Sequence, residues 1–239
     1  MISERQAIDS VQRAQAIEIK ARQGASVTAG SRSCARIHPL VPWICLLTVW
    51  GIAVAAGTLF LGAYAAAPGD AGQALPEWPR DSAIPLDGRR PTLVMFLHPL
   101  CPCSRASVDE LRDILDRCRN RVQAHAVILR SPALEGARGS RIDRQLQDVQ
   151  GLTAWYDDGA SLSRRFGVLT SGHVLVYDQS GRLRYSGGIT PARGHRGENF
   201  GRNAVLAALG GERAECPGVP PFGCPLFEVQ PAGTTEARP

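Results

Sequence analysis

The segment Pro39–Gly69 contains no charged residue, and this uncharged run limits the fold of the chain more than any other feature of the sequence. A helix needs about 20 consecutive apolar residues to cross the hydrocarbon core of a bilayer. The run is long enough to do so with some tilt, and Trp43 and Tyr64 lie near its two ends, as interfacial anchors do. Residues 39–67 are therefore predicted to form one transmembrane helix.

A cleaved signal peptide is the alternative interpretation, because the small residues Ala65–Ala67 offer a cleavage site. The segment 1–38, however, is long for the charged region of a signal peptide, and the apolar run is longer than a signal requires. An uncleaved anchor is therefore favoured. Arginines precede the run and acidic residues are the first charges after it, so the positive-inside rule places residues 1–38 in the cytoplasm and the chain after residue 68 outside.

The net charge of +5 does not indicate a nucleic-acid partner. Residues 1–38 carry six basic and three acidic groups, whereas residues 68–239 carry 21 basic and 19 acidic groups, a difference of only +2. A nearly neutral domain with interspersed charges has no electrostatic footprint for a phosphate backbone. We therefore expect a membrane-associated protein that does not bind nucleic acid.

The exported part begins with residues 68–91, whose five prolines and three glycines predict a linker. In residues 92–211, short apolar runs alternate with amphipathic segments. The predicted strands are Thr92–Leu97, Val122–Leu129, Thr153–Tyr156, His173–Tyr177 and Arg182–Ser186, and the predicted helices are Ser104–Asn120, Arg141–Gln150, Ala160–Phe166 and Asn199–Leu209. The order β-α-β-α-β-α-β-β-α predicts an α/β domain with a mixed sheet and helices on both faces, followed by a cysteine-containing tail, 212–239.

Two cysteines one residue apart lie where the first predicted strand meets the first predicted helix, in the segment FLHPLCPCS (96–104). A helix N-terminus presents free N–H groups and the positive end of the helix dipole, which lower the pKa of a thiol. Pro102 stiffens the turn and Ser104 is expected to cap the helix. Cys101 and Cys103 are therefore predicted to be redox-active rather than inert buried thiols.

At these residues the chain resembles the thioredoxin-like superfamily, in particular membrane-anchored bacterial thiol-disulfide proteins. The resemblance covers residues 91–211 and rests on the strand–CPCS–helix unit, on FGV at 166–168 and on VLVYDQSGRLRYSGG at 174–188. The segments SGGITPARGHRGENFGR and FGCPLF are further similar to bacterial proteins labelled RedB. The resemblance implies a three-layer thioredoxin-like fold, a place in the bacterial inner membrane and a periplasmic or extracytoplasmic domain.

The chain departs from that family at its active-site motif. The family's usual motif is Cys-x-x-Cys, so Cys101 takes the first position, Ser104 takes the second, and Cys103 falls between them. A Cys101–Cys103 disulfide closes a smaller and strained ring, and strain makes a disulfide easier to reduce. We therefore expect the potential of an oxidant or isomerase.

A second departure concerns the loop that faces the active site in this family. Gly172 takes the place of the usual cis-proline, and a cis bond before glycine would cost about 2.5–4 kcal/mol, so a trans bond is predicted. By analogy, His173 lies beside Cys101.

The tail contains Cys216 and Cys224, on either side of the turn-rich stretch PGVPPFG. A structural Cys216–Cys224 disulfide is the favoured interpretation in an oxidising compartment. A second redox pair that exchanges with Cys101 and a metal site are the alternatives. Cys118 continues the apolar stripe of its helix and is predicted to lie in the core.

A glycine-rich loop, 188–197, carries Arg193, His195 and Arg196. By analogy with the family it lies on the active-site face. A solvated loop is the favoured interpretation, and a site for an acidic group is the alternative.

Three functions remain open. In the first, a thiol-disulfide oxidoreductase acts on protein or small-molecule thiols and disulfides without a cofactor: Cys101 attacks and Cys103 resolves the mixed disulfide. In the second, His98, Cys101, Cys103 and His173 bind Cu(I) for delivery, because soft thiolate and imidazole ligands suit that ion. In the third, the domain is a non-catalytic binding module. A peroxidase is not favoured, because no Thr-x-x-Cys arrangement surrounds Cys101.

Overall fold

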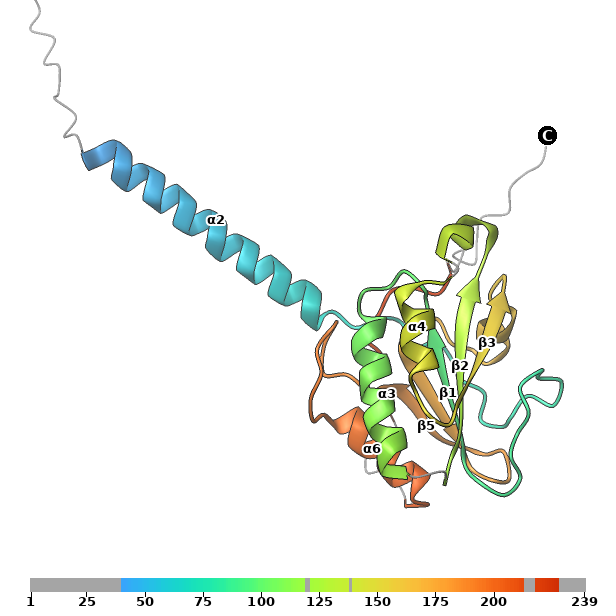
Figure 1. Cartoon of the computed structure of the whole chain (residues 1–239). Coiled ribbons are helices and arrows are strands. Elements are labelled where there is room, and N and C mark those ends of the chain that lie inside the picture. The colour runs from blue at the N-terminus through green and yellow to red at the C-terminus, as the bar shows by residue number, and fades with distance from the viewer. Residues whose placement is uncertain (1–39, 119–120, 138, 213–217, 228–239) are drawn as a thin grey trace, which may run out of the picture. The chain divides into compact units, whose positions relative to one another are not determined.

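The computed structural model of the chain describes residues 40–118, 121–137, 139–212 and 218–227 (Figure 1). The predicted cytoplasmic segment 1–38 and Cys216 lie outside the described residues. The chain divides into two units, one ending at Ile52 and the other beginning at Ala53, and the sheet and the cysteine site belong to the second.

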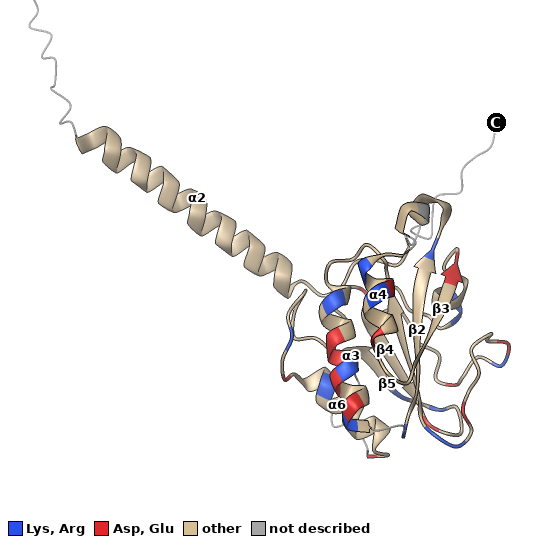
Figure 2. Cartoon of the chain, viewed as in Figure 1, with Lys and Arg blue, Asp and Glu red and all other residues tan. Residues whose placement is uncertain are grey.

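Helix α2, Leu40–Ala66, corresponds to the predicted membrane span. Its most apolar stretch of 18 residues has a mean hydropathy of 2.2, and none of these residues is buried. Figure 2 shows no acidic or basic residue on α2, whereas both kinds occur on α3 and α4. By length and composition this helix can cross a membrane.

One mixed sheet of five strands forms the centre of the second unit, in the order β3-β2-β1-β4-β5. Strands β1, β2 and β3 are parallel, and β4 runs antiparallel to both β1 and β5. The central strands β1 and β4 are buried along their whole length, which explains why they read as unbroken apolar runs. The strands are β1 Thr92–Leu97, β2 Gln123–Arg130, β3 Leu152–Asp158, β4 His173–Tyr177 and β5 Leu183–Gly188.

Helices cover both faces of the sheet, as predicted. The apolar stripe of α3 packs with α4 and α6 on one face, where Leu111, Ile142 and Val205 share a core with residues of β1 and β2. On the other face, α5 packs around Phe96, Phe166 and Tyr177. The helices are α3 Ser104–Cys118, α4 Arg141–Gln147, α5 Ser161–Arg165 and α6 Phe200–Leu209, and a 3-10 helix, Pro132–Ala137, precedes α4.

The segment 68–91, predicted to be a linker, instead packs on the second face of the sheet. Ile84 is 1% exposed, and the Trp78 ring meets those of Phe166 and Tyr177 edge-on at centroid distances of 5.2 and 5.1 Å. Frequent proline and glycine indicate that a segment lacks regular secondary structure. They do not exclude that its few apolar side chains pack against the sheet. Residues 68–91 therefore form part of the domain.

Candidate active site

The Cys-Pro-Cys motif lies in a tight turn between the end of β1 and the start of α3. The Cys101 N–H donates to the His98 carbonyl at 3.1 Å, and the Ser104 N–H donates to the Cys101 carbonyl at 3.2 Å. Both cysteines are thiols and are nearly covered, with 3% of Cys101 and 6% of Cys103 exposed. The buried strand on one side and the amphipathic helix on the other hold this turn in place.

The sulfur of Cys101 is surrounded by hydrogen-bond donors. Burial raises the pKa of Cys101, but hydrogen bonds from the side chain and backbone of Cys224, from the Ser104 hydroxyl and from the Cys103 N–H outweigh burial, so the pKa is lowered. Donors stabilise the charged form of a thiol because a thiolate accepts their hydrogen bonds. Cys101 is thus the thiol that ionises most readily.

The pKa of Cys103 moves in the opposite direction. Burial raises it, and the negative charge and hydrogen bonding of Cys101 raise it further, while the guanidinium of Arg193 lowers it without reversing the shift. The two thiols therefore differ in character, with the charge on Cys101 and the proton on Cys103.

A third thiol, Cys224, completes the cluster. Its backbone N–H lies 3.4 Å from the Sγ of Cys101. Burial raises the pKa of Cys224 to about 12, together with the hydrogen bond and negative charge of Cys101 and the charge of Cys103. The predicted Cys216–Cys224 disulfide involves a residue outside the described part of the chain and stays a prediction.

The loop between α5 and β4 faces the motif through Ser171. The Ser171 hydroxyl accepts from the His98 N–H at 2.8 Å and shares a hydrogen bond of 2.8 Å with the Ser104 hydroxyl. The Ser104 hydroxyl therefore connects the start of α3 to this loop. Its expected role as a helix cap stays a prediction. No sequence pattern identified Ser171.

Gly172 lies at a position that favours glycine. Its φ is +84°, and a Cβ there would lie 2.8 Å from the Ser107 hydroxyl oxygen. Its N–H donates to the Phe96 carbonyl at 2.7 Å, which joins the loop to β1. No described peptide bond is cis, as expected for glycine in place of proline.

The two histidines of the copper hypothesis are engaged elsewhere. His173 is fully buried on β4, its Nε2 lies 2.8 Å from the Ser186 hydroxyl, and burial lowers its pKa to about 4. The Nδ1 of His98 accepts from the Leu100 N–H at 3.2 Å. Within the described residues no three His, Cys, Asp or Glu side chains are grouped as a metal ion requires. A copper site stays a prediction that this arrangement does not favour.

Arg193 brings a positive charge to the site. The sequence favoured a solvated loop around this residue, but its side chain makes several contacts within the protein. Its Nε donates to the Ala67 carbonyl at 3.0 Å and its guanidinium to the Gly223 carbonyl at 2.5 Å. From there it hydrogen-bonds the Cys103 side chain, and its charge lowers the pKa of both Cys103 and Cys224. The family analogy, which placed this loop on the active-site face, was the one indication in the sequence that Arg193 lies near the cysteines.

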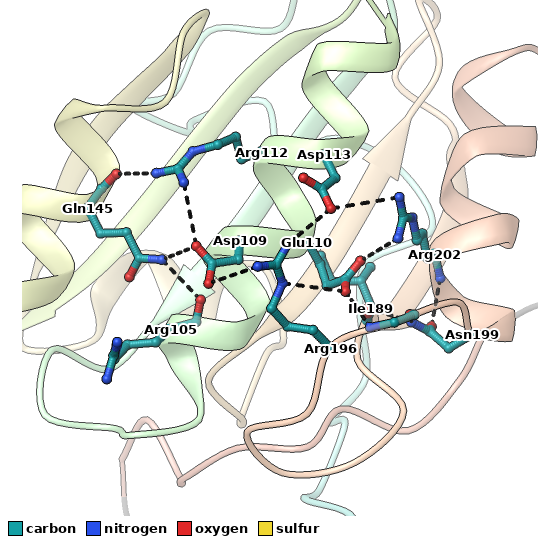
Figure 3. Close-up of polar contacts among 11 residues, drawn as sticks. Arg105, Asp109, Glu110, Arg112, Asp113, Gln145, Ile189, Arg196, Asn199 and Arg202 are labelled. Carbon is teal, nitrogen blue, oxygen red and sulfur yellow. Dashed lines mark hydrogen bonds and ion pairs between the residues drawn. The ribbon is translucent and has the colours of Figure 1, made fainter.

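An ionic network holds the Arg193 loop against α3 (Figure 3). Glu110, only 1% exposed, accepts from the Gly197 N–H at 2.7 Å and from the Arg202 guanidinium at 3.0 Å. Arg196 extends from the loop between Asp109 and Asp113, with nitrogen–oxygen distances of 3.6 and 3.1 Å. The helix that begins at the motif therefore also positions the loop that supplies the cation.

No known family model and no curated protein matches the sequence. Among solved structures, an uncharacterised conserved protein from Geobacillus kaustophilus has a TM-score of 0.51 at 14% identity, over 70% of this chain and 95% of its own. A hypothetical protein from Sinorhizobium meliloti follows with a TM-score of 0.48 at 19% identity, over 67% and 93%. A secreted Mycobacterium tuberculosis disulfide oxidoreductase homologous to E. coli DsbE has a TM-score of 0.38 at 15% identity, over 53% and 84%.

These similarities concern the fold alone. The strand order β3-β2-β1-β4-β5, with three parallel strands, an antiparallel hairpin and helices on both faces, is that of the thioredoxin-like fold. The fold class expected from the motif resemblance is confirmed.

Proposed function

We propose that this chain with a thioredoxin-like fold is a membrane-anchored thiol-disulfide oxidoreductase whose domain lies on the outer side of a bacterial inner membrane. The observation that supports it most directly is the contrast among three clustered thiols. The pKa of Cys101 is lowered, whereas those of Cys103 and Cys224 are raised. Thiol-disulfide exchange needs one thiolate that attacks the substrate and a neighbouring thiol that then resolves the mixed disulfide.

The reaction begins when the Cys101 thiolate attacks one sulfur of a substrate disulfide. A mixed disulfide forms, and the other substrate sulfur leaves and takes a proton. The charge that raised the pKa of Cys103 is then gone, so Cys103 loses its proton more easily, attacks the Cys101 sulfur and releases the second substrate thiol. The substrate gains two electrons, the protein keeps the Cys101–Cys103 disulfide, and no cofactor is needed.

The direction of net electron flow depends on the stability of the reduced protein. Donors around Cys101 stabilise its thiolate, and a stabilised thiolate makes the corresponding disulfide more oxidising. The short Cys-x-Cys ring acts in the same direction. These features favour an oxidant or isomerase over a strong reductant.

Insulin reduction by dithiothreitol, with the full chain in detergent as catalyst, tests this function. Cys101→Ser should reduce the catalysed rate to background because the substitution removes the thiolate that attacks the substrate disulfide. Cys118→Ala is the matched control, since Cys118 is buried on the same helix but belongs to the core. Unchanged catalysis by Cys101→Ser would refute the proposal.

Reporter fusions test the location. Alkaline phosphatase needs an oxidising compartment, so a fusion after Pro239 should be active in a Gram-negative host, and the same enzyme fused before residue 39 should be inactive. The reverse pattern would place the cysteines in the reducing cytoplasm and exclude the proposed topology.

A further inference from the structure

The tail brings Cys224 to the site in a fixed register. Residues 224–226 pair with the loop before β4: the Ser171 N–H donates to the Cys224 carbonyl at 2.9 Å, and the Leu226 N–H donates to the Leu169 carbonyl at 2.8 Å. A side chain at Gly223 would collide with the Ser171 carbonyl, so this close approach depends on glycine. The tail is thus built onto the loop that faces the motif.

Contacts on the other side of Cys224 fix the tail as well. The Val219 carbonyl accepts from the Gly188 N–H at 2.7 Å, and the Pro221 carbonyl accepts from the Gly69 N–H at 2.8 Å. Backbone bonds therefore flank Cys224 in both directions along the chain, and its position against Cys101 follows from them.

The three thiols differ in how far solvent reaches them. Cys101 and Cys103 are 3% and 6% exposed, whereas Cys224 is only partly buried. A partner that approaches the folded domain from solvent reaches Cys224 before it reaches Cys101. Access decides which sulfur of a disulfide is attacked, so this order has chemical consequences.

We propose that Cys224 is a third redox-active thiol, which passes electrons between an external dithiol and the Cys101–Cys103 pair through a Cys101–Cys224 disulfide. This inference rests on the proposed function. In the first step the Cys224 thiolate attacks the Cys101 sulfur of the Cys101–Cys103 disulfide. The Cys101–Cys224 bond forms, the Cys101–Cys103 bond breaks, and the electron pair leaves on Cys103, which takes up a proton.

In the second step a thiolate of the external dithiol attacks the Cys224 sulfur and expels Cys101 as a thiolate. The second thiol of that dithiol, after losing its proton, attacks the first and releases Cys224, which is protonated. The dithiol becomes a disulfide, and Cys101 and Cys103 end as reduced thiols, so two electrons are transferred. The relay thus carries electrons from the dithiol to the pair, and the reduced Cys101 then attacks a substrate disulfide as in the proposed function.

The surroundings of each sulfur suit its part in these steps. Arg193 faces the Cys103 side chain and stabilises the thiolate that leaves in the first step. The Cys224 side chain has no proton to donate in the second step, but the backbone N–H of Cys224, the Ser104 hydroxyl and the Cys103 N–H still stabilise the Cys101 thiolate that leaves, and a better stabilised leaving group leaves faster. The Cys101 charge that raises the pKa of Cys224 is absent while Cys101 is in a disulfide, so Cys224 ionises more easily when it has to attack.

A pocket of about 540 Å³ adjoins this thiol and offers room for the group that bears the external thiol. Gly223 and Pro225, the neighbours of Cys224, both line it, together with apolar Leu169 and Phe227 and the opposite charges of Arg193 and Asp70. A thiol carried by a largely apolar group matches this lining.

Disulfide mapping of the full chain in detergent tests the inference. Trypsin places Cys101 and Cys103 on the peptide 90–105 and both tail cysteines on the peptide 214–239. After oxidation of Cys103→Ser by glutathione disulfide, we expect these two peptides to be joined by a disulfide. Adding Cys216→Ser should leave the joined pair intact, and adding Cys224→Ser should abolish it. A joined pair that survives loss of Cys224, or no joined pair at all, would overturn the inference.

A rate measurement shows that the contact is used. The oxidised wild-type chain is mixed with dithiothreitol, and the appearance of free Cys103 is followed by alkylation and mass spectrometry. Cys224→Ser, a substitution of similar size, should slow this reaction at least about tenfold, because the partner must then reach the buried pair directly. An unchanged rate would overturn the relay, whereas loss of insulin reduction in Cys101→Ser reports on the proposed function separately.

Discussion

The backbone N–H of Cys224 lies 3.4 Å from the Sγ of Cys101, although 123 positions separate the two residues along the chain. The side chain of Cys224 is also the strongest of the donors that lower the pKa of Cys101, ahead of the Ser104 hydroxyl and the Cys103 N–H. The sequence alone attributed the activation of this thiol to the helix N-terminus. In the folded domain, the two largest hydrogen-bond contributions come from Cys224 in the tail.

Cys224→Ala should therefore raise the pKa of Cys101, because the side-chain donor is lost while the backbone N–H and the burial remain. The measurement is the rate of Cys101 alkylation by iodoacetamide as a function of pH, resolved by mass spectrometry in a Cys103→Ser background. Thiolate is the reacting form, so the midpoint should move to higher pH and the rate at pH 7 should fall. Cys224→Ser retains a hydroxyl donor and should shift the midpoint less.

Arg193→Gln should raise the pKa of Cys103, because the substitution removes the cation that opposes burial and the charge of Cys101. The same alkylation profile, read for Cys103 in a Cys101→Ser background, should move to higher pH. Arg193→Lys retains the positive charge and should move it less. Equal shifts in both variants would mean that the guanidinium geometry matters and its charge does not.

Much of the fold was predictable because it depends on local patterns. Buried strands such as β1 and β4 are unbroken apolar runs, and α3 has apolar residues on one side only. Asn199, the first residue of the last predicted helix, caps α6 and accepts from the Arg202 N–H at 2.9 Å. Such signals lie within a few residues of the structure that they determine.

The rest of the site depends on contacts without a local pattern. Cys224 reaches Cys101 only because an irregular tail pairs with an irregular loop, and neither has a periodicity to detect. Ser171 and Arg193 act through side-chain hydrogen bonds from loops to distant parts of the chain. The odd number of cysteines after residue 68, which is five, and the segment FGCPLF were the available signals, and both were compatible with a purely structural disulfide.

Removing the buried carboxylate of the network in Figure 3 should destabilise the domain. Glu110→Ala leaves the Arg202 side chain, which is 8% exposed, without the ionic partner that it meets at 3.0 Å. Breaking one side of a buried ion pair costs about 3–5 kcal/mol. Urea unfolding followed by tryptophan fluorescence measures the loss.

Asp116→Asn is the matched control for this prediction. Asp116 lies on the same helix but is exposed, so the free energy of unfolding should change by no more than about 0.5 kcal/mol. Equal stability of Glu110→Ala and the wild type would show that the network does not hold the loop to α3.

Gly172→Ala should impair both stability and exchange. An alanine at φ +84° is strained by about 1–2 kcal/mol, and its Cβ would also crowd the Ser107 hydroxyl at 2.8 Å. Gly139→Ala separates the two effects, because Gly139 has a φ of +69° but no atom within 4 Å of an added Cβ. We expect Gly172→Ala to lower the free energy of unfolding more than Gly139→Ala does. Only Gly172→Ala should slow insulin reduction, because it displaces the loop that holds Ser171 and the tail. Equal rates of insulin reduction in the two variants would show that this loop takes no part in the reaction.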